Sequence, residues 1–209
     1  GYIIRQKNYK KMVVRKNLKR KYALISVFDK KNLKYLCENL NKFNYNFISS
    51  GSTGKKIRSM GFPCKDISRL TKYKEMFDGR VKTLNPLIYG SLLFVRDNKL
   101  HLKQFKTLKM PEIDIVVVNL YPFEKTLKKN NDNIIEMIDI GGPSLLRAAG
   151  KNFKYITPIM DQTDYKKLIK NLNKNNGITD IEFRKKMAQK SYKEISKYDN
   201  SISKWLNEK

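Results

Sequence analysis

One stretch of seven residues, Ile113–Asn119 (IDIVVVN), constrains the fold more than any other part of the sequence. It is apolar at nearly every position, whereas a strand with one face in water alternates apolar and polar side chains. Continuous apolar character is typical of a strand in a parallel sheet that helices cover on both faces. A second apolar run, at residues 22–28, has the same character. The sequence therefore predicts an α/β protein with a buried parallel sheet.

The rest of the chain predicts strands and helices in alternation. Further strands are expected at residues 47–48 and 155–159. Apolar residues at helical spacing predict helices at 33–43, 57–60, 134–138, 141–149, 165–172 and 183–205. This alternation indicates a doubly wound α/β sheet, in which ligands bind beyond the carboxyl ends of the strands.

The chain is strongly basic. Its 209 residues include 45 Lys and Arg against 19 acidic residues, a formal net charge of +26. Such a charge favours anionic partners: nucleic acid, anionic substrates or acidic proteins. Only nine of the cations are arginine, however, and the lysines are scattered, which favours a solvated lysine-rich surface that binds nucleic acid only non-specifically. We expect residues 1–21 to be a basic mobile extension, followed by a single domain at 22–209.

Several classes of protein are disfavoured by what the sequence contains. Two cysteines, Cys37 and Cys64, and a single histidine predict neither a disulfide framework nor a metal site. No run approaches the roughly 20 apolar residues of a membrane span, and no signal-peptide core follows the basic start. We therefore expect a soluble protein of a reducing compartment, the cytoplasm.

Three loops have the composition of ligand-binding turns. Residues 49–54 (SSGSTG) follow a strand and precede a helix, where hydroxyls and backbone N–H groups can hold an anion. Residues 78–83 (DGRVKT) place two cations and a hydroxyl around a glycine, as a phosphate clamp would. Residues 139–144 (DIGGPS) put two glycines at a helix start, where the backbone can approach a ligand closely. Taken alone, the first two loops are better explained as plain turns, and the third is about equally well explained as a plain helix-entry turn.

Four strings occur together in a specific order: SVFDK (26–30), DGRVKTLNP (78–86), VVVNLYPF (116–123) and IDIGGPSLLRAAGKN (138–152). In order and spacing they resemble the N-terminal domain of the bifunctional purine-biosynthesis family, which joins phosphoribosylaminoimidazolecarboxamide formyltransferase to IMP cyclohydrolase. The resemblance runs from about residue 21 to about residue 206. It implies a methylglyoxal-synthase-like fold, a Rossmann-like parallel sheet flanked by helices.

The resemblance also implies the reaction. IMP cyclohydrolase closes the purine ring of 5-formamidoimidazole-4-carboxamide ribonucleotide to give IMP and water, the last step of de novo purine biosynthesis. It further implies a homodimer, and a formyltransferase domain that is missing from this chain or carried separately. The reaction needs donors or a cation at the developing oxyanion, together with proton relays, and no metal or redox cofactor.

Site residues are carried over by motif position. The catalytic candidates are Lys82, Tyr121, Asp139 and Lys151. The candidates for substrate binding are Ser26, Lys30, Ser50, Gly51, Ser52, Thr53, Arg80 and Thr83 around the 5′-phosphate, and Asn119, Gly141 and Gly142 near the base. An unperturbed lysine has a pKa of about 10.4, so Lys82 is expected to act as an ammonium group that stabilises the oxyanion. Asp139 is expected to orient Lys151 and Tyr121, or simply to cap the following helix.

Four positions depart from the family pattern. Asn85 and Tyr89 stand where the family usually has histidine, Ser52 replaces a glycine of the phosphate turn, and Phe153 replaces another histidine. Ser52 is expected to strain a turn that prefers glycine. Two alternatives stay open: a phosphate-sensing regulatory domain of the methylglyoxal-synthase-like fold, and a polyanion-binding protein that has lost its activity.

Overall fold

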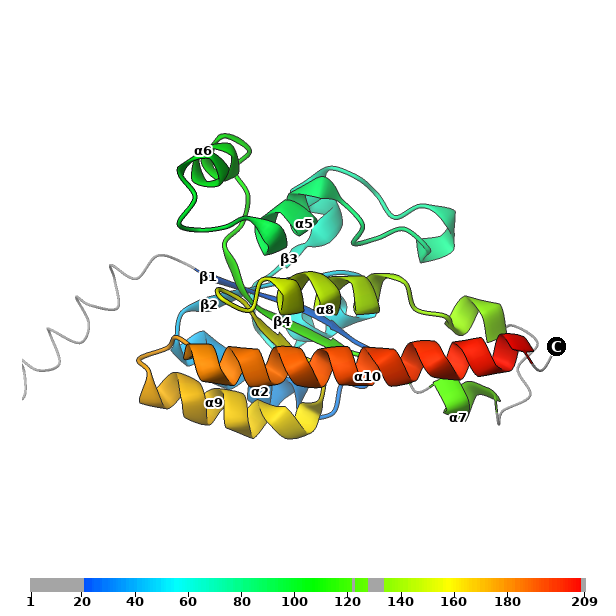
Figure 1. Ribbon diagram of the computed structural model, residues 1–209. Coiled ribbons are helices and arrows are strands. Elements are labelled where there is room, and N and C mark those ends of the chain that lie inside the picture. The colour runs from blue at the N-terminus through cyan, green and yellow to red at the C-terminus, as the bar shows by residue number, and fades with distance from the viewer. Residues whose placement is uncertain (1–20, 122, 128–133, 208–209) are drawn as a thin grey trace, which may run out of the picture.

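Five parallel strands form the centre of the protein (Figure 1). The structure is a computed structural model that describes residues 21–121, 123–127 and 134–207. The strand order is β3-β2-β1-β4-β5. The strands are β1 (Lys21–Val27), β2 (Tyr45–Ser49), β3 (Cys64–Asp66), β4 (Ile113–Asn119) and β5 (Thr157–Ile159).

Helices connect every pair of consecutive strands. On the first half of the chain these are α2 (Leu33–Lys42), α3 (Gly51–Ser59), α4 (Ile67–Thr71), α5 (Pro86–Leu93) and α6 (Lys99–Thr107), with the short 3-10 turn η1 (Phe77–Gly79). On the second half α7 (Phe123–Leu127), the 3-10 turn η2 (Ile134–Met137) and α8 (Gly141–Lys151) connect β4 to β5. After β5 come the 3-10 turn η3 (Gln162–Asp164) and helices α9 (Tyr165–Lys174) and α10 (Ile181–Asn207).

Strand β4 lies inside the sheet and is buried along its first six residues. Its one charged residue, Asp114, is buried as well. The carboxylate forms ion pairs with the Lys21 ammonium at 3.0 Å and with the Arg96 guanidinium at 2.8 Å, so the buried charge is compensated. The burial of successive residues of β4, whose side chains point to opposite faces, confirms the expectation of a parallel sheet that is covered on both faces.

Alternate residues of the strands belong to two separate cores. Ala23, Ile25 and Val27 of β1 pack with α2 and α9 on one face, whereas Leu24 packs with α5 and α8 on the other. Figure 1 shows α2 and α9 below the sheet and α5 and α8 above it. The period of two residues in a strand produces this division, because successive side chains point to opposite faces.

Helix α10 closes one edge of the sheet. It lies along β5 and α8 and continues past the sheet to α7 (Figure 1). At that end Phe123, Tyr198 and Trp205 form a third small apolar cluster, separate from the two cores. The long helix therefore connects the sheet to the segment that precedes α8.

The structure confirms the predicted fold and corrects several details. Residues 134–138 were expected to form a helix but form only the 3-10 turn η2. Strand β3 and helices α4 to α7 were not anticipated, because they are short or lack a clear apolar period. Residues 1–20 of the predicted extension lie outside the described residues, and Lys21 already belongs to β1.

Candidate active site

Three segments that are distant in sequence meet at the carboxyl ends of the strands. They are the amino end of α3 after β2, the loop of residues 73–85 (the cationic loop), and residues 137–142 before and at the start of α8 (the Asp139 turn). Two short distances show that the segments are close together. The Lys82 Nζ atom lies 4.0 Å from the position that a Cβ would occupy on Gly51. The Thr83 Oγ1 atom lies 2.8 Å from the position that a Cβ would occupy on Gly141.

The cationic loop folds back on itself at η1. Met76 and Val81 form an isolated antiparallel bridge, and Gly79 between them has a φ of +91°. A Cβ on Gly79 would lie 2.4 Å from the Lys82 Cε atom. The glycine of the DGRVKT motif is therefore needed both for its backbone conformation and for the space through which the Lys82 side chain passes.

Lys82 and Arg80 of the cationic loop are paired with carboxylates. The Lys82 ammonium lies 3.4 Å from the Glu75 carboxylate. The Arg80 guanidinium donates to both oxygens of Glu136 in η2, and this hydrogen bonding lowers the pKa of Glu136. All four side chains are substantially exposed, so these pairs are weak enough for an anionic ligand to replace them.

The amino end of α3 presents free backbone donors. Ser50 is the N-cap, in extended conformation and without a side-chain capping bond, and Gly51 follows with a φ of +53°. Ser52 lies in the helix and has no positive φ, so the strain expected there is absent; the positive φ falls on a glycine. The Thr53 hydroxyl is engaged with β1, since it donates to the Val27 carbonyl at 2.9 Å.

The loop after β1 is held by Asn119 at the end of β4. The Asn119 Oδ1 atom accepts from the Phe28 and Asp29 N–H groups at 2.6 and 3.2 Å, and its Nδ2 donates to the Asp29 carbonyl at 2.9 Å. Asn119 thus holds a loop, where a contact with the base was expected. In that loop the Lys30 ammonium donates to the Phe28 carbonyl at 3.3 Å, and Ser26 is half-buried in β1.

An aromatic pair lies where β1 and β4 end. The Phe28 ring is 60% exposed and contacts the Tyr121 ring edge-on, with centroids 4.5 Å apart. Phe28 lies within the SVFDK motif (26–30), but the motif alone does not mark it as a site residue. Its exposure next to Tyr121 is the property that sequence reasoning could not supply.

Asp139 is the acid of the site that caps α8, and it is exposed at the surface of the protein. Its Oδ1 atom accepts the Gly142 N–H at 2.9 Å, so Asp139 caps α8 from the position before Ile140. Desolvation raises the pKa of Asp139, and the backbone N–H groups of Gly142 and Gly141 act in the opposite direction. A Cβ on Gly142 would lie 2.3 Å from Asp139 Oδ2, so only glycine leaves room for this capping carboxylate.

Two of the departing residues have clear structural roles. Asn85 caps α5, because its Oδ1 atom accepts the Leu87 N–H at 2.9 Å, and Pro86 occupies the first helical position. Tyr89 lies one turn further along α5. Burial raises the pKa of Tyr89, while the Ser144 and Thr83 hydroxyls beside it lower it. Tyr89 thus lies between the cationic loop and α8.

Lys151 is separated from the other catalytic candidates. It is exposed and is the last residue of α8, whereas Asp139 precedes the first residue of that helix. A helix of this length spans about 15 Å at 1.5 Å per residue. The expectation that Asp139 orients Lys151 is therefore wrong within one chain, since the two groups lie at opposite ends of α8.

The described residues show neither a cluster of metal ligands nor a membrane-spanning helix. Among them no three His, Cys, Asp or Glu side chains are grouped so as to hold a metal ion. None of the described helices is both long enough and apolar enough to cross a membrane.

The fold and the position of the site define a class of protein. The family model described as MGS-like domain matches residues 32–144, and the chain belongs to this family. The crystal structure of ForH has the same fold: the TM-score is 0.79 at 27% identity, over 90% of this chain and 97% of that one.

Sequence comparisons identify a narrower group of relatives within the MGS-like family. The family model described as AICARFT/IMPCHase bienzyme matches residues 149–209. Relatives described as bifunctional purine biosynthesis protein PurH are 43% identical over 186 residues in Ruegeria sp. (strain TM1040) and 45% identical over 190 residues in Clostridium botulinum (strain Hall). These alignments cover 88% and 90% of this chain but only 35% and 38% of the relatives. The chain thus spans little more than a third of the length of the relatives it matches.

Proposed function

We propose that this chain is an IMP cyclohydrolase that closes the ring of 5-formamidoimidazole-4-carboxamide ribonucleotide, giving IMP and water. The observation that carries the proposal is the meeting of Lys82, the amino end of α3 and the Asp139 turn at one edge of the sheet. The sequence similarity to bifunctional purine biosynthesis proteins supports the same reaction. Neither a phosphate sensor nor a polyanion binder would require a capped carboxylate at the same edge of the sheet as a paired lysine.

The reaction is intramolecular, so the site must fix one rotamer of the substrate. The carboxamide nitrogen attacks the formyl carbon, and the formyl oxygen gains negative charge as the carbinolamine forms. We assign the 5′-phosphate to the amino end of α3, where Ser50, Gly51 and Ser52 supply backbone donors and hydroxyls. We assign the base to the exposed edge of the Phe28–Tyr121 pair. Holding both ends of the ribonucleotide brings nitrogen and carbon into the attacking geometry.

Lys82 and Asp139 have different roles in the chemistry. The Lys82 ammonium stabilises the oxyanion once substrate displaces it from Glu75, a contribution of about 3 kcal/mol for one well-placed donor. Asp139 accepts or returns the proton of the carboxamide nitrogen; desolvation raises the pKa of Asp139, which makes its carboxylate a better proton acceptor. Tyr121 supplies a hydroxyl for the proton relay.

Lys151 enters this proposal only through a second copy of the chain. Its place at the far end of α8 excludes it from the site formed by its own Asp139. A homodimer is part of the proposal, and so is a formyltransferase on a separate or further domain, because the relatives are bifunctional and the chain matches only part of them. A cytoplasmic location completes it. Sedimentation of the wild type and of Lys151→Ala would test whether association and activity are linked.

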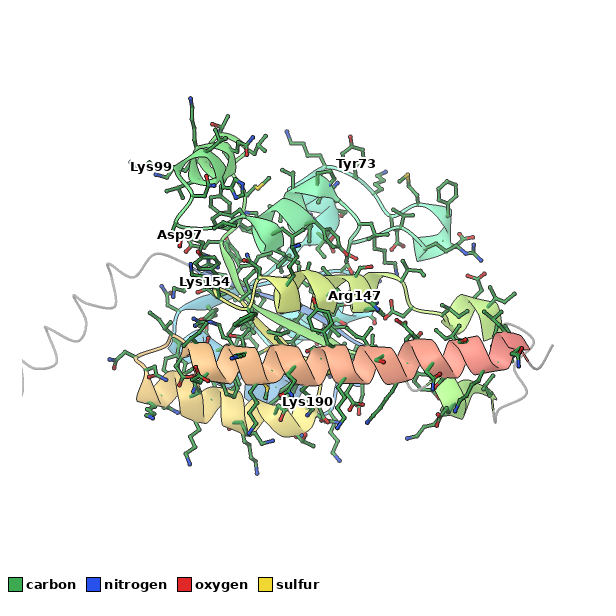
Figure 2. All side chains as sticks on the ribbon, viewed as in Figure 1. Tyr73, Asp97, Lys99, Arg147, Lys154 and Lys190 are labelled. Carbon is green, nitrogen blue, oxygen red and sulfur yellow. The ribbon has the colours of Figure 1, made fainter. Side chains whose placement is uncertain are left out.

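Ring closure followed by ultraviolet absorbance is the direct test. Purified protein is mixed with the formylated ribonucleotide in folate-free buffer, and Lys82→Ala is compared with Lys154→Ala. Lys154 is a matched control because it is also an exposed lysine in an ion pair, at 2.8 Å from Asp97, but lies at the opposite end of the sheet from the site (Figure 2). We expect activity in the wild type and in Lys154→Ala and a loss of 100-fold or more in Lys82→Ala. Folded wild-type protein with no rate above the uncatalysed reaction would refute the proposal.

A further inference from the structure

The hydroxyl of Tyr198, in α10, is directed at the backbone of the Asp139 turn. It accepts a hydrogen bond from the Asp139 N–H at 2.8 Å and donates to the Met137 carbonyl at 3.4 Å. The side chain is only 8% exposed, and its ring packs edge-on against Phe123 with centroids 6.3 Å apart. A residue 59 positions away in the sequence thus contacts the segment that carries Asp139.

The two hydrogen bonds determine the direction of the Asp139 side chain. Asp139 lies outside α8, so no intrahelical hydrogen bond fixes its backbone N–H. With that N–H held by Tyr198, the carboxylate reaches the Gly142 N–H at 2.9 Å and caps the helix. Tyr198 therefore acts on the site through the backbone of Asp139 and does not contact the expected position of the substrate.

Helix α10 has a second attachment to α8 that does not involve the Asp139 turn. The Tyr192 hydroxyl donates to the Arg147 carbonyl at 3.1 Å, and the Asp199 carboxylate pairs with the Arg147 guanidinium at 2.7 Å. Arg147 is labelled in Figure 2, on the α8 ribbon next to α10. Tyr192 and Tyr198 are thus two tyrosines of one helix whose hydroxyls each reach a backbone atom, and only Tyr198 reaches the Asp139 turn.

We propose that Tyr198 is a positioning residue of the active site, and that α10 thereby forms part of the catalytic framework in addition to closing the sheet. The inference rests on the proposed function for its kinetic consequence. The structural part, that Tyr198 orders the Asp139 turn, stands on the hydrogen bonds alone. Sequence reasoning did not single out Tyr198, because nothing local indicates its partner.

The kinetic test compares Tyr198→Phe with Tyr192→Phe. Each variant removes one hydroxyl from α10 and keeps the ring. We expect Tyr198→Phe to lower kcat about tenfold with KM within twofold of wild type, since the reacting groups are misplaced while the phosphate site is intact. Tyr192→Phe is expected to stay within twofold of wild type in both constants. Equal kcat values for the two variants in an active protein would overturn the inference.

Amide hydrogen exchange gives a readout that does not depend on activity. In the wild type the Asp139 N–H is expected to be protected, although it lies outside a helix; rapid exchange there would overturn the inference without any variant. In Tyr198→Phe the Asp139 amide loses its acceptor, and its exchange is expected to accelerate at least tenfold, while Tyr192→Phe leaves it unchanged. If wild-type protein shows no ring closure but the amide behaves as expected, the proposed function fails and the positioning role stands.

Discussion

The cationic loop and the Asp139 turn approach each other at the candidate site, yet they are stabilised in different ways. The cationic loop is exposed: Phe77 is 73% accessible, and Lys82 and Arg80 pair with carboxylates that are themselves in water. The Asp139 turn also reaches the surface, but backbone hydrogen bonds hold it: the Asp139 carboxylate accepts the Gly142 N–H, and the Tyr198 hydroxyl accepts the Asp139 N–H. The cationic loop presents charges that an anionic ligand can pair with, whereas the Asp139 turn holds a carboxylate in one orientation.

This difference follows from what each group has to do. A cation that exchanges one anion for another must remain near water, because a fully desolvated ion pair would be too costly to open. A carboxylate that transfers protons must be held in one orientation, and partial desolvation raises its pKa and makes it a better proton acceptor. Substitutions in the cationic loop and in the Asp139 turn should therefore differ in how strongly they affect activity and how strongly they affect stability.

Asp139→Asn is expected to have the largest effect on activity. The amide oxygen of asparagine can still accept the Gly142 N–H, whereas proton transfer is lost, so kcat should fall about 100-fold or more. Stability should be unchanged or higher. Because the folded-state pKa of Asp139 lies above its unfolded value, the stability it contributes at low pH is lost as pH rises through the folded pKa. Thermal unfolding at pH 4 and pH 8 checks this: the Tm advantage of the variant should be larger at pH 8.

Gly142→Ala should damage both stability and activity. The added methyl would lie 2.3 Å from the Asp139 carboxylate and 2.9 Å from Leu120, so the cap must open. Overpacking of this kind costs about 1–3 kcal/mol, which urea unfolding would measure. The matched control is Gly61→Ala, where the added methyl meets no atom within 4 Å and only the positive φ of +86° is strained. Equal destabilisation by the two changes would argue against a close-packed Asp139 turn.

Gly79→Ala probes the cationic loop in the same way. The positive φ and the Lys82 stem both oppose a side chain here, but the stem is flexible and in water. We expect about 1 kcal/mol of destabilisation and a loss of activity of about tenfold, because Lys82 is displaced while the core is untouched. Activity and urea unfolding measured together would check it; a stability loss as large as that of Gly142→Ala would contradict the contrast between the two regions.

Glu75→Gln should have the smallest effect. It removes the partner of Lys82 from an exposed pair, so the change in stability should be below about 1 kcal/mol. Nucleotide monophosphates should bind a few-fold more tightly, since the ammonium no longer has to leave a carboxylate. Titration at low and at moderate salt checks this, and the gain should shrink as salt screens the pair. Weaker binding by the variant would show that Glu75 orients Lys82 rather than competing with the ligand.

The sequence by itself determined the parallel sheet and the edge on which the site lies. The apolar run Ile113–Asn119 can be buried only if helices cover both faces, and the small-residue loops fall where parallel strands end. The motifs around Lys82 and Asp139 also predict these two residues as catalytic candidates, and their roles stay a prediction. These signals are local: each is contained in a window of a few residues.

Only the tertiary structure decided which side chains are available and which are engaged. Thr53 and Asn119 look like ligand contacts in sequence, but long-range hydrogen bonds commit them to β1 and its following loop. The separation of Lys151 from Asp139 depends on the length and direction of α8, and the role of Tyr198 depends on a contact across 59 residues. Such pairings arise from how the elements pack together, and no periodicity within a single segment encodes them.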